Sequence, residues 1–206
     1  MKKFTFALML AAVALFVASP LFAEGMMFGI KGGLNMANVT GDDTEGTSMK
    51  IGGVGGVFMT YNITEIFAIQ PEVLFSMKGA SQDTLSTTVS LKFNYIEIPL
   101  LFKVTLPTEG KIKPSLYAGP ALGILMSANA EVGGVSADIK DQMKSTDIGI
   151  LAGAGIGYQM ENGSLLSLEV RYEVGMTSIV DTGDSDVGAD VKNSVISVMV
   201  GYGFAF

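Results

Sequence analysis

Apolar and small residues alternate along the last fourteen positions of the chain, 193–206. The residues of one parity are apolar or aromatic: Ile196, Val198, Val200, Tyr202, Phe204 and Phe206. The other parity is small or weakly polar, and a period of two predicts a β-strand with two different faces. An apolar edge strand that ends in aromatics would invite aggregation of a water-soluble domain. A closed transmembrane barrel has no edge, and its aromatics can lie at the membrane interface.

The same period recurs along the chain and predicts eight strands, at 26–39, 51–61, 66–78, 90–104, 115–127, 147–160, 165–179 and 193–206. The third and seventh have the clearest pair of faces. The second is so rich in glycine that its facing is not predicted. In the fourth, Lys92 and Asn94 share one parity while Glu97 and Lys103 share the other. Either the first pair lies beyond the apolar layer, or a bulge shifts the register.

Short and long connections alternate strictly between these segments. The shorter ones are 62–65, 106–114 and 161–164, and the longer, polar ones are 40–50, 79–89, 128–146 and 180–192. This alternation predicts an all-β fold, an eight-stranded antiparallel up-and-down transmembrane β-barrel with both termini at the short-turn end. A soluble lipocalin-like barrel or a sandwich would have an apolar interior, whereas here the charged residues lie on the face that must be enclosed.

The first 23 residues have the features of a signal peptide. Lys2 and Lys3 precede an apolar run over 4–17, and Ser19 to Ala23 form a short tail before Glu24. After Ala23 no apolar run approaches the roughly 18 residues that a membrane-spanning helix requires. We therefore expect a signal peptide at 1–23 and an exported barrel at 24–206, located in the cell outer membrane.

Composition removes several classes of function. The net charge is −7 and becomes −9 without the two lysines of the leader, which disfavours nucleic acid as a partner. The chain has no Cys and no His, so disulfides, thiolate chemistry and the commonest catalytic base are excluded. No serine lies in a recognisable nucleophile motif. We expect no enzyme activity, no cofactor and no metal site, although the acidic segment 181–190 leaves calcium as a minor alternative.

Six segments carry a resemblance to a known family: 28–35 (FGIKGGLN), 70–79 (QPEVLFSMKG), 95–103 (YIEIPLLFK), 117–120 (YAGP), 153–157 (GAGIG) and 169–172 (EVRY). With them the mature chain resembles the porin-family outer-membrane β-barrel domain, which includes PorT-like proteins, and the eight-stranded barrels of the OmpX and OmpA type. The resemblance implies the fold and the location rather than pore activity. Tyr202, Phe204 and Phe206 are similar to the C-terminal signal that the barrel assembly machinery, a transient partner, recognises.

Eight polar residues are predicted to face the lumen: Lys31, Gln70, Glu72, Lys78, Glu97, Glu169, Arg171 and Glu173. Arg171 is the only arginine of the sequence, and Glu169 and Glu173 lie two residues away on its face. Eight strands leave a lumen that side chains can fill, and a guanidinium can bridge several carboxylates. The pattern favours a plug of salt bridges, with an ion-selecting constriction as the alternative.

The sequence therefore favours a barrel with a filled lumen that has a structural, adhesive or partner-binding role through its four long loops. The alternatives are a small diffusion channel and, from the PorT resemblance alone, an accessory factor for secretion or assembly. Outer-membrane lipid and lipopolysaccharide are the expected surroundings, and an extracellular or secretion-complex protein is a candidate partner. Pro71, Pro99 and Pro120 lie inside predicted strands at one height, where we expect bulges or a bend.

Deletion of Phe206 is expected to impair outer-membrane insertion, because the terminal aromatic belongs to the predicted assembly signal. Surface labelling of intact cells measures the inserted fraction. Normal surface levels of the truncated protein would contradict the assignment.

Overall fold

The computed structural model describes residues 25–42, 44–84, 87–181 and 190–205. The leader predicted at 1–23 and Phe206 lie outside this part of the chain, so the division into leader and barrel stays a prediction. The described strands are β1 (Met26–Gly41), β2 (Ser48–Asn62), β3 (Phe67–Thr84), β4 (Thr87–Thr105), β5 (Ile112–Val132), β6 (Val135–Asp138), β7 (Thr146–Gln159), β8 (Leu165–Gly175) and β9 (Val191–Ala205). A short 3-10 helix, η2 (Lys140–Gln142), follows β6.

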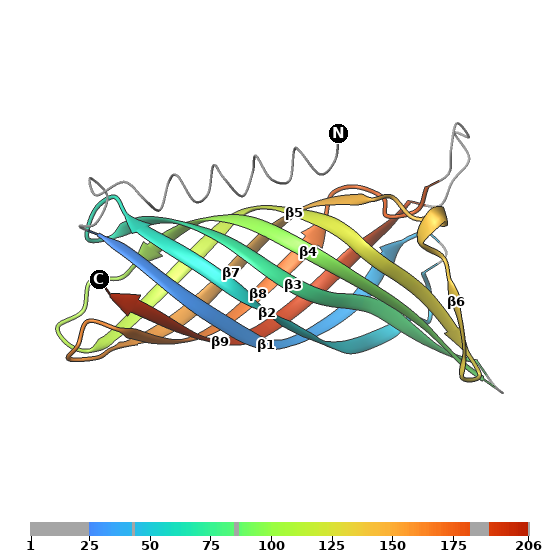
Figure 1. Ribbon diagram of the computed structural model, residues 1–206, viewed down its shortest axis with the longest axis horizontal. Coiled ribbons are helices and arrows are strands. Elements are labelled where there is room, and N and C mark those ends of the chain that lie inside the picture. Colours follow the sequence, from blue (N-terminus) through green and yellow to red (C-terminus); the bar gives the residue numbers. More distant parts are fainter. Residues whose placement is uncertain (1–24, 43, 85–86, 182–189, 206) are drawn as a thin grey trace.

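Eight of these strands form a closed antiparallel barrel, as the sequence predicts. Neighbours follow the order β1-β2-β3-β4-β5-β7-β8-β9, and β9 pairs with β1 from Met27↔Ala205 to Gly41↔Val191. The chain ends at the same end of the barrel as it enters β1 (Figure 1). That end, with turns 63–66, 106–111 and 160–164, is called the short-turn end below, and the opposite end is called the loop end.

The strand faces separate apolar from polar residues. Large apolar side chains on the outside are about half exposed, for example Ile30, Val73, Phe102, Leu168 and Val200. The charged residues on the other face of these strands, among them Lys31, Glu72, Glu97 and Glu169, are buried in the interior. In an outer-membrane barrel the outward apolar band meets hydrocarbon. Among the described residues, no helix has the length and apolar character needed to cross a membrane.

The two strands with uncertain facing have one consistent orientation each over most of their length. Val54, Phe58 and Thr60 of β2 face inward. In β4 the residues from Phe93 to Lys103 keep a single alternation, so Lys92 and Asn94 face outward. A register shift does occur at this level, but the extra residue, Met126, belongs to β5. The register shift of the second alternative is thus present in the β4–β5 ladder, but β4 itself has no bulge, and the position of Lys92 and Asn94 beyond the apolar layer stays a prediction.

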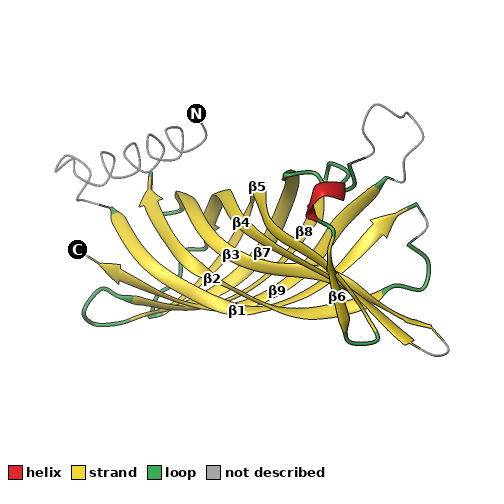
Figure 2. Ribbon diagram, turned by 45° about the vertical axis from the view of Figure 1, so that its right-hand side comes forward, coloured by secondary structure: helices red, strands yellow, loops and turns green. Residues whose placement is uncertain are grey.

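The predicted long loops at 79–89 and 128–146 are wrong in extent. β3 and β4 continue to the pair Thr84↔Thr87, and β5 continues into a hairpin with β6, from Val132↔Val135 to Asn129↔Asp138. These extensions project beyond the loop end (Figure 2). In the hairpin of β5 and β6, residues 129–132 and 135–138 are all at least partly exposed, so this part lacks the alternation by which a strand is recognised. The seventh predicted strand also ends earlier, at Gly175 rather than Ile179.

The three prolines lie at one level on adjacent strands, as expected. Pro71 is opposite Leu100, the neighbour of Pro99, and Pro99 is opposite Ala121, the neighbour of Pro120. The expected bulges are not found there, because the register is the same on both sides of each proline. The ladder instead lacks the pairs between Pro71 and Leu74 and between Pro99 and Phe102. Missing N–H donors thus interrupt the ladder without displacing it.

Gly79 has a φ of 139°, and a Cβ on it would lie 2.0 Å from the Leu91 carbonyl oxygen. We expect Gly79→Ala to destabilise the barrel by about 1–3 kcal/mol, a typical cost of a strained backbone conformation. Urea titration of the protein in lipid vesicles measures the change. Gly32→Ala is the matched control, because its Cβ would make an ordinary 3.6 Å contact with the Val54 oxygen. Equal stability of the two variants would contradict the prediction.

Candidate functional site

The barrel interior collects the polar residues that sequence analysis selected. All eight are buried: Lys31 from β1, Gln70, Glu72 and Lys78 from β3, Glu97 from β4, and Glu169, Arg171 and Glu173 from β8. Residues two apart on a strand point to the same face, which places Gln70 with Glu72 and aligns the three β8 residues. Strands distant in sequence therefore contribute to one charged layer inside the barrel.

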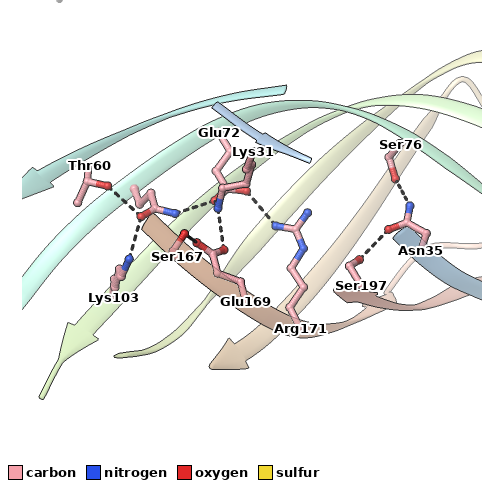
Figure 3. Close-up of polar contacts among 11 residues, drawn as sticks. Lys31, Asn35, Thr60, Glu72, Ser76, Lys103, Ser167, Glu169, Arg171 and Ser197 are labelled. Atoms are coloured by element: carbon pink, nitrogen blue, oxygen red, sulfur yellow. Dashed lines mark hydrogen bonds and ion pairs between the residues drawn. The ribbon is translucent and has the colours of Figure 1, made fainter. Parts of the chain in front are cut away.

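Glu72 is the centre of the first part of this layer. Its Oε1 accepts hydrogen bonds from Lys31 Nζ at 2.7 Å and from Gln70 Nε2 at 2.7 Å. Its Oε2 accepts one from Arg171 Nη1 at 2.9 Å (Figure 3). Lys31 also donates to Glu169 Oε2 at 2.7 Å. β1, β3 and β8 are thus joined across the lumen by charged contacts.

Lys78 forms a second ionic group. Its Nζ contacts Glu173 at 2.8 Å and also pairs with Glu97. The same ammonium lies 5.3 Å from the centroid of the Tyr95 ring, within the range of a cation–π contact. This group therefore joins β3, β4 and β8.

Sequence analysis did not select several lumen residues that the barrel brings to these groups. Asn35 donates to Ser76 Oγ at 2.8 Å and accepts from Ser197 Oγ at 2.8 Å. Asp147 accepts a hydrogen bond from Asn193 at 2.8 Å. Parity would have indicated Asn35 and Ser197, but short polar side chains carry a weak signal among glycine and alanine. Asp147 is the first residue of its predicted strand and follows a polar loop. The sequence pattern therefore gives no sign that its side chain faces inward.

Lys103 shares the parity of Glu97 in the sequence but is not among the eight residues predicted to face the lumen. It is buried in the lumen wall, and its Nζ lies 3.4 Å from Gln70 Oε1. Thr60 donates to the same Gln70 oxygen at 2.9 Å. These contacts extend the polar layer toward the short-turn end (Figure 3).

Three apolar clusters occupy further parts of the interior. One consists of Leu101, Tyr117, Ala121 and Leu151, and another of Val54, Leu74 and Met199. The largest lies toward the loop end and consists of Val39, Ala80, Phe93, Tyr95, Leu125, Ala128 and Ile179. We call this third group the mouth cluster. Ile139, Met143 and Val180, from the segments after β6 and β8, pack against it.

The connections after β6 and after β8 are bonded to each other over the mouth cluster. Met143 and Val180 form an isolated antiparallel bridge. Lys144 N donates to the Ile179 oxygen at 2.8 Å, and Asp181 N donates to the Gln142 oxygen at 3.0 Å. The described ends of two loops that are distant in sequence therefore form one covering over the lumen.

Charge balance explains why these side chains are held so closely. Four buried cations, Lys31, Lys78, Lys103 and Arg171, face five buried carboxylates, Glu72, Glu97, Asp147, Glu169 and Glu173. A buried charge is costly unless it is paired and hydrogen-bonded. The described residues include no group of three or more acidic, His or Cys side chains arranged to hold a metal ion.

The predicted assembly signal is described in part. Tyr202 and Phe204 lie on the outer face of β9, and their rings meet edge to face with centroids 4.8 Å apart. Phe206 lies outside the described residues. The role of these aromatics in assembly remains a prediction.

The fold and its enclosed polar layer define a small outer-membrane barrel protein. Residues 21–181 match the family described as "Outer membrane protein beta-barrel domain", and the chain belongs to this family. The expected resemblance to small outer-membrane barrels and the expected location in the outer membrane are thereby confirmed. No curated protein matches the chain in a sequence search.

Two solved structures share the fold. OprG of Pseudomonas aeruginosa is 18% identical with a TM-score of 0.55, and the match covers 87% of this chain and 95% of that one. Neisserial surface protein A, NspA, is 18% identical with a TM-score of 0.51, covering 87% of this chain and 97% of that one. At this identity the likeness extends to the fold alone.

Arg171→Met is expected to lower the free energy of unfolding by about 3–5 kcal/mol, the usual cost of removing one partner of a buried ion pair. Met retains most of the apolar volume, so the loss reports on the charge left on Glu72. Urea titration in lipid vesicles measures it.

Lys111→Met is the matched control, because its 2.9 Å pair with Glu161 is solvent-exposed and such pairs contribute little. The double variant Glu72→Met with Arg171→Met should regain part of the loss, because it restores the wild-type excess of one buried carboxylate and Lys31 keeps Glu169 as its partner. Wild-type stability of Arg171→Met would rule out a structural role for the ionic layer.

Proposed function

We propose that this outer-membrane barrel has a lumen filled by side chains and acts through its loop end, in a structural, adhesive or partner-binding role. The observation that carries the proposal is the filling of the interior. The ionic groups around Glu72 and Lys78 join opposite walls, and the mouth cluster lies beyond them toward the loop end. A lumen filled in this way leaves the protein's outer surface as the place where it meets other molecules.

The loop end supports a binding role by its shape. The paired extensions of β3, β4, β5 and β6 project as a ribbon beyond the rest of the barrel (Figures 1 and 2). All four residues of β6 are exposed, and it pairs only with β5 among the described strands. In outer-membrane barrels the longer loops face the exterior. A projecting, solvated ribbon can therefore reach a partner beyond the lipid headgroups.

The same features argue against the alternative functions, a diffusion channel and an enzyme. A diffusion channel needs a continuous polar path, which the ionic layer and the mouth cluster oppose. An enzyme of this type would work without histidine, since the chain has none. The role as an accessory factor for secretion or assembly rests on family resemblance, and a native complex with secretion components would support it instead.

Purified protein in a planar bilayer is expected to give no stable single-channel steps, because the ionic layer closes the lumen. Removing inward charge around Arg171 should be necessary before any conductance develops. Stable steps from the wild-type protein would favour the diffusion channel.

Photo-crosslinking on intact cells tests the binding role. A crosslinking amino acid at Ser136 in β6 should capture a specific partner, because this residue is exposed on the projecting ribbon. The same amino acid at Thr108, exposed in a short turn at the opposite end, is the control and should not capture that partner. Equal capture from both positions, or capture of lipopolysaccharide alone from Ser136, would contradict a protein-binding role.

A further inference from the structure

A cavity of about 600 Å³ lies at the short-turn end of the barrel. Its lining includes side chains of the lumen wall and residues of the short turns, among them Lys103, Ser115, Leu106 and Pro107. This volume lies within the usual range of small-molecule sites. In outer-membrane barrels the short turns face the periplasm, so the cavity is accessible from that side.

Lys103 differs from the other three buried cations of the described interior. Lys31, Lys78 and Arg171 each contact at least one carboxylate at ion-pair distance. Lys103 is 9% exposed, and no described carboxylate pairs with it. Its one hydrogen bond is the 3.4 Å contact with Gln70 Oε1. An ammonium so buried without a counterion has a strong electrostatic preference for an anion.

The groups around Lys103 suit a carboxylate. Thr60, Ser115 and Ser167 line the cavity with hydroxyl groups. Thr60 and Ser167 already donate their single protons to Gln70 and Glu169. Ser115 donates to the Gly155 oxygen over 3.5 Å, the longest of the three bonds, so its hydroxyl is the one most easily turned toward an anionic oxygen. The one buried acid of the lining is Glu169, and its charge is already paired with Lys31 at 2.7 Å. Glu169 also accepts a hydrogen bond from Ser167 at 3.2 Å. An incoming carboxylate would therefore meet Lys103 as the buried unpaired charge. Lys113, nearer the turns, is a second cation of the lining, and its Nζ donates to the Thr108 oxygen at 3.1 Å.

The lining on the side of the turns is mixed. Met27 and Leu165, at the starts of β1 and β8, and Leu106 and Pro107, in the turn after β4, supply apolar surface. Polar and charged side chains lie among them: Asn62, Thr64, Glu65, Thr108, Lys113 and Gln159. A ligand with its charged group at Lys103 could place an apolar end against the first four side chains. The cavity thus combines a buried cation with a partly apolar entrance.

We propose that this cavity binds a small organic anion with a carboxylate head and a short apolar body. The carboxylate pairs with Lys103 Nζ and accepts a hydrogen bond from the Ser115 hydroxyl, which exchanges its 3.5 Å bond with the Gly155 oxygen for one to the ligand. The apolar body lies against Met27, Leu106, Pro107 and Leu165. This site is separate from the loop end, so it gives the protein a periplasmic ligand in addition to any outer partner.

The test uses hexanoate as the probe and the protein extracted from outer membranes into a nonionic detergent. Methyl resonances of Leu106 and Leu165 are followed by NMR during the titration. Hexanoate should shift both resonances saturably, whereas hexanamide, of the same size and uncharged, should bind at least about tenfold more weakly. Equal binding of the two compounds would overturn the proposal, because Lys103 would then select nothing.

Variants separate the site from binding to the micelle. Lys103→Met keeps the apolar stem and should lose at least about tenfold in hexanoate affinity. Lys92→Met, an outward position near the other end of the same strand, should bind as the wild type does. Ser115→Leu fills the cavity without changing its charge and should also lose binding, which keeps the test decisive if Lys103→Met folds poorly. Unchanged affinity in both cavity variants, or shifts that do not saturate in the wild type, would refute the site.

Discussion

Closure of the sheet is the constraint on which the rest of this structure depends. In hydrocarbon no water can satisfy a free strand edge, so β9 must pair with β1 along its length. Once the sheet is closed, residues of one parity along the regular part of each strand are enclosed and those of the other parity face outward. The glutamates and lysines of β3 and β8 are therefore placed inside by the same geometry that puts their apolar neighbours outside. Their pairing follows from enclosure, since an unpaired charge there would be costly.

The two ends of the barrel interior differ in structure. The mouth cluster and the bonded loop segments around Met143 and Val180 cover the loop end. The cavity beside Lys103 lies at the other end, and the ionic layer around Glu72 lies between. The projecting ribbon (Figure 2) and the cavity beside Lys103 therefore lie at opposite ends of the barrel, on either side of the ionic layer.

At several positions the closed sheet overrides the local preference of a residue type. The three prolines remove ladder donors at one level, yet the register continues unchanged because neighbouring pairs on either side hold it. The bulges occur elsewhere, at Met126 in β5 and in the glycine-rich part of β2 between Met49 and Val54. An extra residue there lets a strand change its facing where the barrel emerges from the apolar layer. The glycines near Met49 and Val54 admit the close approach of β3, because a Cβ on Gly52 would lie 2.4 Å from the Met77 oxygen.

The sequence by itself determined the barrel, its strand order and the facing of its best-marked strands, because alternating polarity records which residues meet lipid. It also selected eight enclosed polar residues, Lys31 to Glu173, from parity alone. It did not determine the strand extensions at 79–89 and 128–132, since partly exposed residues such as 129–132 have no alternation to read. It could not show that Glu72 accepts from both Lys31 and Arg171, or that Lys103 is left without a carboxylate. The contacts of Glu72 join residues up to 99 positions apart, and only the tertiary structure decides which enclosed charges meet.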